Sequence, residues 1–155
     1  MIFRTGASMV GAVAVAAPLA AQVAQPVRFA SDVFVERFIP GPGGRMSRVL
    51  ERPDRLNPGD RVVFVVNWKA DRGHDFTVTN PLPRTVAFQR SADGLEEVSI
   101  DGGRTWGTLE DLRVRDADGS MRHATPDDVT HVRWRVPARL ALAGTGQFTY
   151  RGVVR

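Results

Sequence analysis

The residue types that most often carry catalysis or metal binding are scarce in this chain. It has no cysteine, which excludes a thiol nucleophile and a cysteine-based metal site. The three histidines, His74, His123 and His131, stand at no short chelating spacing from one another. No serine lies in a recognised nucleophile context with a histidine and an aspartate. We therefore predict that the protein is not an enzyme and has no catalytic residue, no cofactor and no metal site.

One short segment nevertheless has the residue types of a calcium-binding loop. Asp116 and Asp118 alternate just before Gly119 and Ser120, as oxygen ligands do around a hard cation. The bidentate glutamate that closes an EF-hand is absent at the required spacing. The same residues are typical of an ordinary Asp-Gly turn, which we favour. The sequence alone leaves calcium binding by Asp116 and Asp118 open.

A second segment, from Ser99 to Trp106, reads Ser-Ile-Asp-Gly-Gly-Arg-Thr-Trp. It resembles the aspartate box of sialidases and related propellers. The resemblance implies a hairpin turn in which Asp101 caps backbone amides, a glycine adopts an unusual φ and Trp106 packs beneath. Propellers repeat this box around several blades, so a single copy does not predict a propeller or a glycosidase. A packed indole is our expectation, and the alternative is a carbohydrate-binding module in which an exposed Trp106 stacks on a sugar ring.

The framework that positions these segments is clearest after the turn at residues 57–60, Asn-Pro-Gly-Asp. Proline fixes φ and glycine permits positive φ, so the chain reverses there. The run that follows places Val62, Phe64, Val66 and Trp68 on one face at the period of a β-strand. This pattern predicts a largely buried strand.

Other short β-prone runs recur at roughly ten-residue spacing, separated by Pro, Gly and Asp. They lie at residues 32–38, 45–51, 76–79, 85–89, 98–100, 112–115, 129–136 and 146–154. Neither a long amphipathic helix nor an internal repeat is evident. The sequence therefore predicts an all-β fold, an immunoglobulin-like antiparallel β-sandwich of about seven to nine strands.

The first 21 residues have the pattern of a secretory signal peptide. A short positive start at Met1 to Arg4 precedes an Ala/Val-rich run, and small residues stand before a cut expected after Ala21. We predict a signal peptide at residues 1–21, an extended leader at 22–31 and one sandwich domain at 32–155. This organisation predicts a periplasmic or secreted protein with no integral membrane insertion.

The formal net charge of +4 raises the question of nucleic-acid binding. Lys69 is the only lysine, and the arginines are scattered among acids, as between Arg48 and Arg55. A dense basic run with interleaved aromatic residues, which marks a nucleic-acid surface, is missing. We therefore expect no nucleic-acid partner.

Four segments in order resemble one known family. They are Pro58 to Trp68, Asp75 to Pro83, Val132 to Trp134 and Leu142 to Tyr150. Together they are similar to the bacterial conserved-repeat surface domain, catalogued as domain of unknown function eleven. The resemblance covers residues 33–155 as a single copy. It implies an immunoglobulin-like sandwich on the exported side of a bacterial envelope.

These observations lead to one functional prediction. We expect an exported, non-catalytic β-sandwich module with a structural or protein-interaction role in the bacterial cell envelope. Its partners are expected to be envelope or surface proteins that bind sheet edges and loops, such as Pro40 to Gly44 and Lys69 to His74. The identity of the partner, the oligomeric state and the open edge strand are not specified by the sequence.

Overall fold

The structure is a computed structural model, and it describes residues 27–155. The predicted signal peptide at residues 1–21 lies outside the described residues, as do residues 22–26. Within the described part, no helix has the length and apolar character needed to span a membrane.

Strands dominate the described chain, with one short α-helix and two 3-10 turns between them. The strands are β1 (Val27–Pro40), β2 (Met46–Glu51), β3 (Arg61–Ala70), β4 (Phe76–Pro81), β5 (Val86–Ser91), β6 (Glu97–Ser99), β7 (Arg113–Arg115), β8 (Met121–His123), β9 (His131–Val136) and β10 (Thr145–Val154). The helix is α1 (Ala138–Ala141), and the 3-10 turns are η1 (Pro42–Gly44) and η2 (Pro126–Asp128).

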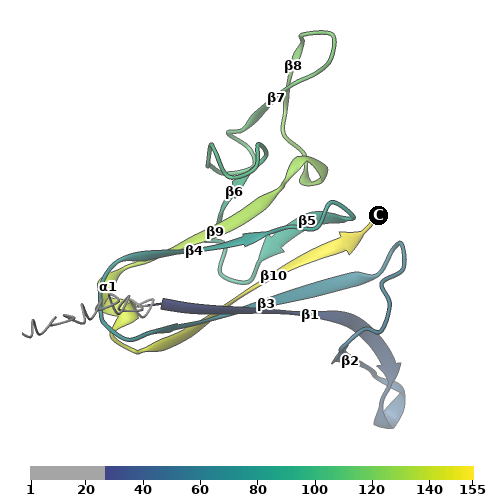
Figure 1. Cartoon of the computed structure of the whole chain (residues 1–155). Coiled ribbons are helices and arrows are strands. Elements are labelled where there is room, and N and C mark those ends of the chain that lie inside the picture. The colour runs from purple at the N-terminus through teal and green to yellow at the C-terminus, as the bar shows by residue number, and fades with distance from the viewer. Residues whose placement is uncertain (1–26) are drawn as a thin grey trace, which may run out of the picture.

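Eight of these strands form two antiparallel sheets that face each other (Figure 1). The larger sheet has the order β2-β1-β3-β10-β5, and the smaller has the order β4-β9-β6. All of the pairings within both sheets are antiparallel. The predicted all-β antiparallel sandwich is thereby confirmed.

Strand β3 lies at the centre of the larger sheet, between β1 and β10. Its predicted face is confirmed, since Val62, Phe64, Val66 and Trp68 are all buried. Alternation at period two sends these side chains toward the smaller sheet, where they form the core with β4 and β9.

Aromatic rings fill the space between the layers. Trp134 on β9 stacks on Phe148 of β10, with ring centroids 4.8 Å apart. Tyr150, two residues further along β10, stacks on Phe64 of β3 at 4.6 Å. The Trp134–Phe148 stack joins the two layers, whereas Tyr150 and Phe64 stack within the larger sheet, and both pairs place aromatic surface in the core.

The first strand differs from its prediction. It begins at Val27, so the prediction that it starts at Asp32 is wrong, and residues 27–31, assigned to an extended leader, belong to a strand. Val27 pairs opposite Ala70, and the pairing with β3 continues to Val35. Residues 28–31 carry exposed side chains and show no clear apolar alternation, because this strand is held by its backbone ladder with β3 more than by burial.

Two hairpins extend away from the sandwich (Figure 1). β2 pairs only with the second half of β1, so this end of the larger sheet continues beyond the smaller one. β7 and β8 form a separate two-stranded sheet on the other side of the molecule. Neither β8 nor the helix α1 was predicted, because three or four residues carry too little periodicity to be recognised.

Candidate functional site

The Ser99 to Trp106 segment forms the hairpin turn that the aspartate-box resemblance implies. Oδ1 of Asp101 accepts the backbone N–H groups of Arg104 at 3.0 Å and Thr105 at 2.9 Å. Its Oδ2 accepts the Thr105 hydroxyl at 2.7 Å. Gly102 and Gly103 adopt positive φ angles of 79° and 88°, which glycine tolerates without strain. The carboxylate is therefore the cap of the turn.

Hydrogen bonds hold this carboxylate in its charged form. Donation by the Thr105 backbone, the Thr105 hydroxyl and the Ser99 hydroxyl lowers the pKa of Asp101 well below its usual range. Ser99 is fully buried, and its Oγ also accepts the N–H of Gly103 at 2.9 Å. The polar atoms of the box are thus engaged with one another, as in a structural turn.

Trp106 lies half-buried beside strand β9. The Arg133 guanidinium covers one face of its indole, with Cζ 4.3 Å from the ring centroid, and His131 meets the ring edge. The indole N–H donates to the Gly103 carbonyl at 2.9 Å. The sugar-stacking alternative requires an open ring face, and Arg133 already occupies one.

An ion cluster that sequence reasoning missed sits next to this indole. Nε of Arg133 and Nε of Arg135 both donate to Oε2 of Glu97, at 2.8 and 3.0 Å. The bond from Arg135, followed by that from Arg133, lowers the pKa of Glu97. The Arg-x-Arg alternation on the predicted strand was the available signal, because residues two apart share one face. The cluster fixes the arginine that covers Trp106.

The Asp116 to Ser120 segment forms the turn of the β7–β8 hairpin. Asp118 Oδ1 accepts the N–H and the hydroxyl of Ser120, at 2.9 and 2.7 Å. Asp116 Oδ1 instead accepts Nε of Arg122 at 3.1 Å. The two carboxylates have different partners, as in the Asp-Gly turn that we favoured over a calcium loop.

The three histidines are not brought together. His74 lies near the ring of Phe76, His123 Nδ1 lies 3.2 Å from the Glu110 carbonyl oxygen, and His131 Nδ1 lies 3.1 Å from the Thr130 hydroxyl. Across residues 27–155, no three histidine, aspartate or glutamate side chains converge as a metal site does.

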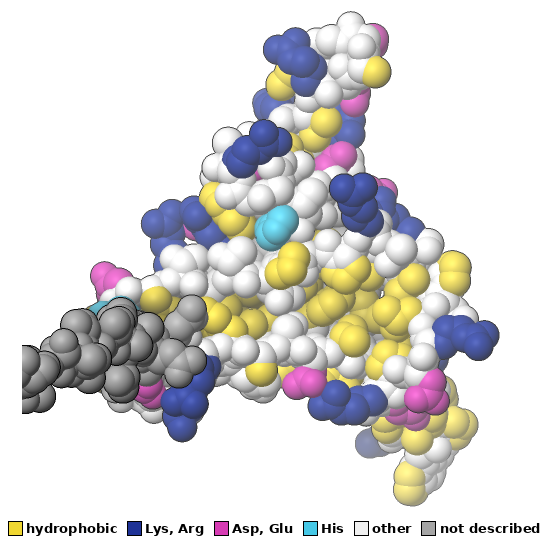
Figure 2. All heavy atoms as spheres, in the orientation of Figure 1, with side chains coloured by type: hydrophobic (Ala, Val, Ile, Leu, Met, Phe, Trp, Pro, Cys, Tyr) yellow, Lys and Arg dark blue, Asp and Glu magenta, His cyan; other side chains and the backbone are white. Residues whose placement is uncertain are grey.

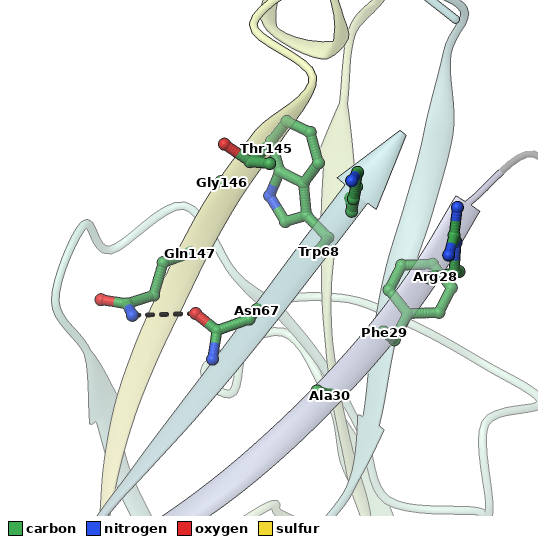
Figure 3. A pocket seen from close by; sticks show the side chains of 9 residues that line it. Arg28, Phe29, Ala30, Asn67, Trp68, Thr145, Gly146 and Gln147 are labelled. Atoms are coloured by element: carbon green, nitrogen blue, oxygen red, sulfur yellow. Dashed lines mark hydrogen bonds between the residues drawn. The ribbon is translucent and has the colours of Figure 1, made fainter. Parts of the chain in front are cut away.

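A shallow groove lies where β1, β3 and β10 run side by side, near the start of the described chain (Figure 3). Its lining includes Arg28, Asn67 and Gln147, and Nε2 of Gln147 donates to Oδ1 of Asn67 at 2.9 Å. Gly146 is at this point because the Trp68 ring lies across it and leaves no room for a Cβ. The lining offers amide and cationic groups but no nucleophile paired with a base.

Exposed apolar side chains gather instead on the β1–β2 hairpin (Figure 2). Phe38 and Ile39 at the end of β1 are 51% and 45% exposed, and Met46 and Leu50 on β2 are 59% and 43% exposed. Single exposed apolar residues are common on protein surfaces, whereas four lie on this one hairpin, Phe38, Met46 and Leu50 on one face and Ile39 on the other.

The four outer strands of the two sheets differ in how well their edges are protected. β5 packs against η2, and β6 is bridged at Val98 by two backbone hydrogen bonds with Gly107. β4 ends in Pro81 and presents Thr77 and Thr79 to solvent. Within residues 27–155, β2 pairs on one side only, as β4 does, but β2 contains no proline and exposes the apolar side chains of Met46 and Leu50. It is the open edge that the sequence did not identify.

Comparisons with family models, with curated proteins and with solved structures found no match to this chain. The geometry of the described residues therefore has to support a function by itself.

Proposed function

We propose that this chain is an exported, non-catalytic β-sandwich module that binds protein partners of the bacterial cell envelope through the edge of strand β2. The observation that carries the proposal is the open side of β2, a six-residue edge strand with exposed apolar side chains. Such an edge presents a row of N–H and C=O groups to which an extended segment of a partner adds as a further strand.

The side chains of β2 support specificity in such a complex. Met46 and Leu50 are exposed on one face of the strand, and Arg48 between them is held by Glu36 of β1. Main-chain hydrogen bonds supply affinity in strand addition, and alternate side chains select the partner. Two exposed apolar side chains on either side of this paired arginine favour a partner strand with matching apolar residues.

Export and envelope location rest on the sequence. The signal-peptide pattern at residues 1–21 and the family resemblance over residues 33–155 both point to the exported side of a bacterial envelope. Sequencing the mature N-terminus after cell fractionation tests this part. A protein that still begins at Met1 in the cytoplasm overturns it.

Site-specific photo-crosslinking in cells tests the interaction. A photoreactive phenylalanine analogue at Ser47, whose side chain is exposed on β2, is expected to capture an envelope protein. The matched control places the same analogue at Thr77, an exposed position on the edge strand β4. Capture from Ser47 and not from Thr77 supports the proposal.

An edge-blocking variant sharpens this experiment. Leu50→Lys, in the chain that carries the analogue at Ser47, adds a charge at an exposed position of β2, where lysine discourages strand addition, and is expected to abolish capture without changing thermal stability. Equal capture from both edges, or capture that survives Leu50→Lys, overturns the assignment to β2.

A further inference from the structure

The turn that closes the β1–β2 hairpin combines exposed apolar side chains with a backbone that has few free N–H groups. We call residues 37–50 the hairpin tip. It holds Phe38, Ile39, Met46 and Leu50, four of the nine large hydrophobic side chains that are exposed in residues 27–155. In Figure 1 this hairpin extends beyond the two layers, and Figure 2 shows its hydrophobic side chains together at one end of the molecule.

In the turn at residues 40–45, which joins the two strands of the tip, two residues carry no N–H group and two more donate their N–H to backbone carbonyls. Pro40 and Pro42 carry no N–H group. The N–H of Gly41 donates to the Arg45 carbonyl at 2.7 Å, and the N–H of Gly44 donates to the Gly41 carbonyl at 3.3 Å. Because an unsatisfied N–H group is costly to remove from water, these features reduce the cost of moving the turn at residues 40–45 into an apolar surrounding.

The charge of the tip has one sign. Residues 37–50 contain three arginines and no acid. Arg37 donates to Asp60 at 2.7 Å and Arg48 pairs with Glu36, so these two are held by carboxylates at the base of the hairpin. Arg45, in contrast, is exposed and has no carboxylate of the described residues within ion-pair distance. The end of the tip is therefore cationic.

We propose that the hairpin tip docks on the surface of a phospholipid bilayer that carries anionic headgroups. Phe38, Ile39 and Met46 enter the interface between headgroups and acyl chains, and Arg45 contacts the headgroup phosphates. Apolar side chains backed by cations are the combination that holds a peripheral protein at such an interface. Met46 belongs both to the tip and to the edge of β2, but docking of Phe38, Ile39 and Arg45 on lipid requires no protein partner.

A second copy of the chain is a poorer occupant for this surface. Two tips that meet end to end bring the unpaired Arg45 of one copy close to that of the other, and like charges oppose such a contact. A bilayer with anionic headgroups supplies the opposite charge and accommodates a protruding turn without a shaped pocket. The charge of the tip therefore favours lipid.

Co-flotation with vesicles tests the proposal. The chain, with its N-terminus identified by mass spectrometry, is mixed with vesicles of phosphatidylglycerol and phosphatidylethanolamine or of phosphatidylcholine alone. Binding is expected to be stronger to the anionic vesicles and to weaken with salt. Arg45→Ala is expected to lower binding about fivefold, the effect of one basic residue near an anionic surface.

Two matched triple variants distinguish vesicle binding by the tip from vesicle binding by other exposed apolar side chains. Phe38→Ser with Ile39→Ser and Met46→Ser is expected to lower vesicle binding at least about tenfold. The control, Leu95→Ser with Met121→Ser and Leu142→Ser, changes three exposed apolar side chains elsewhere and is expected to bind as the unmodified chain does. Equal binding by both variants means that another segment contacts the lipid, and it overturns the proposal.

The absence of native cysteine allows a local readout. An environment-sensitive fluorophore on Ile39→Cys is expected to shift to the blue with anionic vesicles, and the same fluorophore on Leu95→Cys is expected to stay unchanged. No shift at either position overturns the proposal. Concentration-dependent oligomers in light scattering that disappear in the tip variant, without vesicle binding, assign the surface to a second copy and also overturn it.

Discussion

Asn80 and Tyr150 join the two layers of the sandwich through one buried hydrogen bond. Nδ2 of Asn80 on β4 donates to Oη of Tyr150 on β10 at 2.7 Å. Both side chains are buried, and the tyrosine ring is stacked on Phe64. Buried polar groups in proteins are nearly always paired, so the amide and the phenol each depend on the other. The bond also fixes how the smaller sheet sits on the larger one.

Tyr150→Phe is expected to lower the free energy of unfolding by about 1 to 2 kcal/mol. The phenylalanine ring preserves the stack on Phe64, but the buried amide of Asn80 keeps only its long bond to the Pro81 carbonyl, at 3.5 Å. Urea denaturation monitored by tryptophan fluorescence measures the change. The double variant Asn80→Leu with Tyr150→Phe is expected to cost less than the two single changes together, because both polar groups are then removed. Additive effects contradict the coupling.

Ionisation of the Tyr150 phenol is expected to limit the stability of the folded protein at alkaline pH. Burial raises the pKa of Tyr150 above its usual value, with the bond from Asn80 opposing in part. A raised pKa means that the folded state favours the protonated phenol. Its contribution to stability is fully present below the ordinary pKa of about 10 and is lost as the pH rises beyond it.

Tyr150 is the only tyrosine, so absorbance near the phenolate band reports on it alone. We expect no ionisation of the folded protein at pH 10, and ionisation at higher pH together with unfolding seen by circular dichroism. Titration with an ordinary midpoint in a folded protein contradicts the burial.

Gly146 is expected to tolerate no larger residue. A Cβ at this position would overlap the indole of Trp68, which lies across the glycine from the neighbouring strand. Gly146→Ala is therefore expected to lower the free energy of unfolding by about 1 to 3 kcal/mol through overpacking. Gly107→Ala is the matched control, because its Cβ would lie 3.5 Å from Leu112, an ordinary contact. Equal effects of the two changes on the urea midpoint contradict this account.

Much of the fold could be predicted because its strands have a clear apolar period. Val62, Phe64, Val66 and Trp68 put an apolar side chain at every second position of β3, and a turn precedes the strand, so the pattern specifies a buried strand. β1 could not be bounded in the same way, since its first residues are exposed and are held by pairing with β3. Register partners distant in sequence leave no signal in the local pattern.

The candidate sites likewise include features that the sequence predicts and features that it does not. The aspartate-box turn could be predicted because Asp101, Gly103 and Trp106 interact within eight residues. Arg133, which covers the indole, comes from a strand that follows much later in the chain, so its contact with Trp106 was not predictable. The open edge of β2 depends on the order of strands in the sheet, and sequence patterns define strands without defining their neighbours.

Trp106 is expected to be a packing residue of the box and not a sugar platform. Trp106→Ala removes the bond to the Gly103 carbonyl and the contact with Arg133, and for a half-buried indole we expect a loss of about 1.5 kcal/mol. Thermal denaturation measures this loss. A glycan array is expected to show no binding that depends on Trp106. Binding that disappears in the Trp106→Ala variant would restore the carbohydrate alternative.

Asp101 is expected to make the box sensitive to acid. Its pKa is lowered because the folded turn donates several hydrogen bonds to the carboxylate. A lowered pKa means that this stabilisation is present above the ordinary value of about 3.9 and is lost as the pH falls below it.

Asp101→Asn is expected to lower the melting temperature by a few degrees at pH 7 and to reduce the further loss between pH 4 and 2. Asp127→Asn is the control, because Asp127 is exposed and its carboxylate lies 3.6 Å from Arg155 without capping a turn. Identical acid profiles for the two variants contradict the capping role of Asp101.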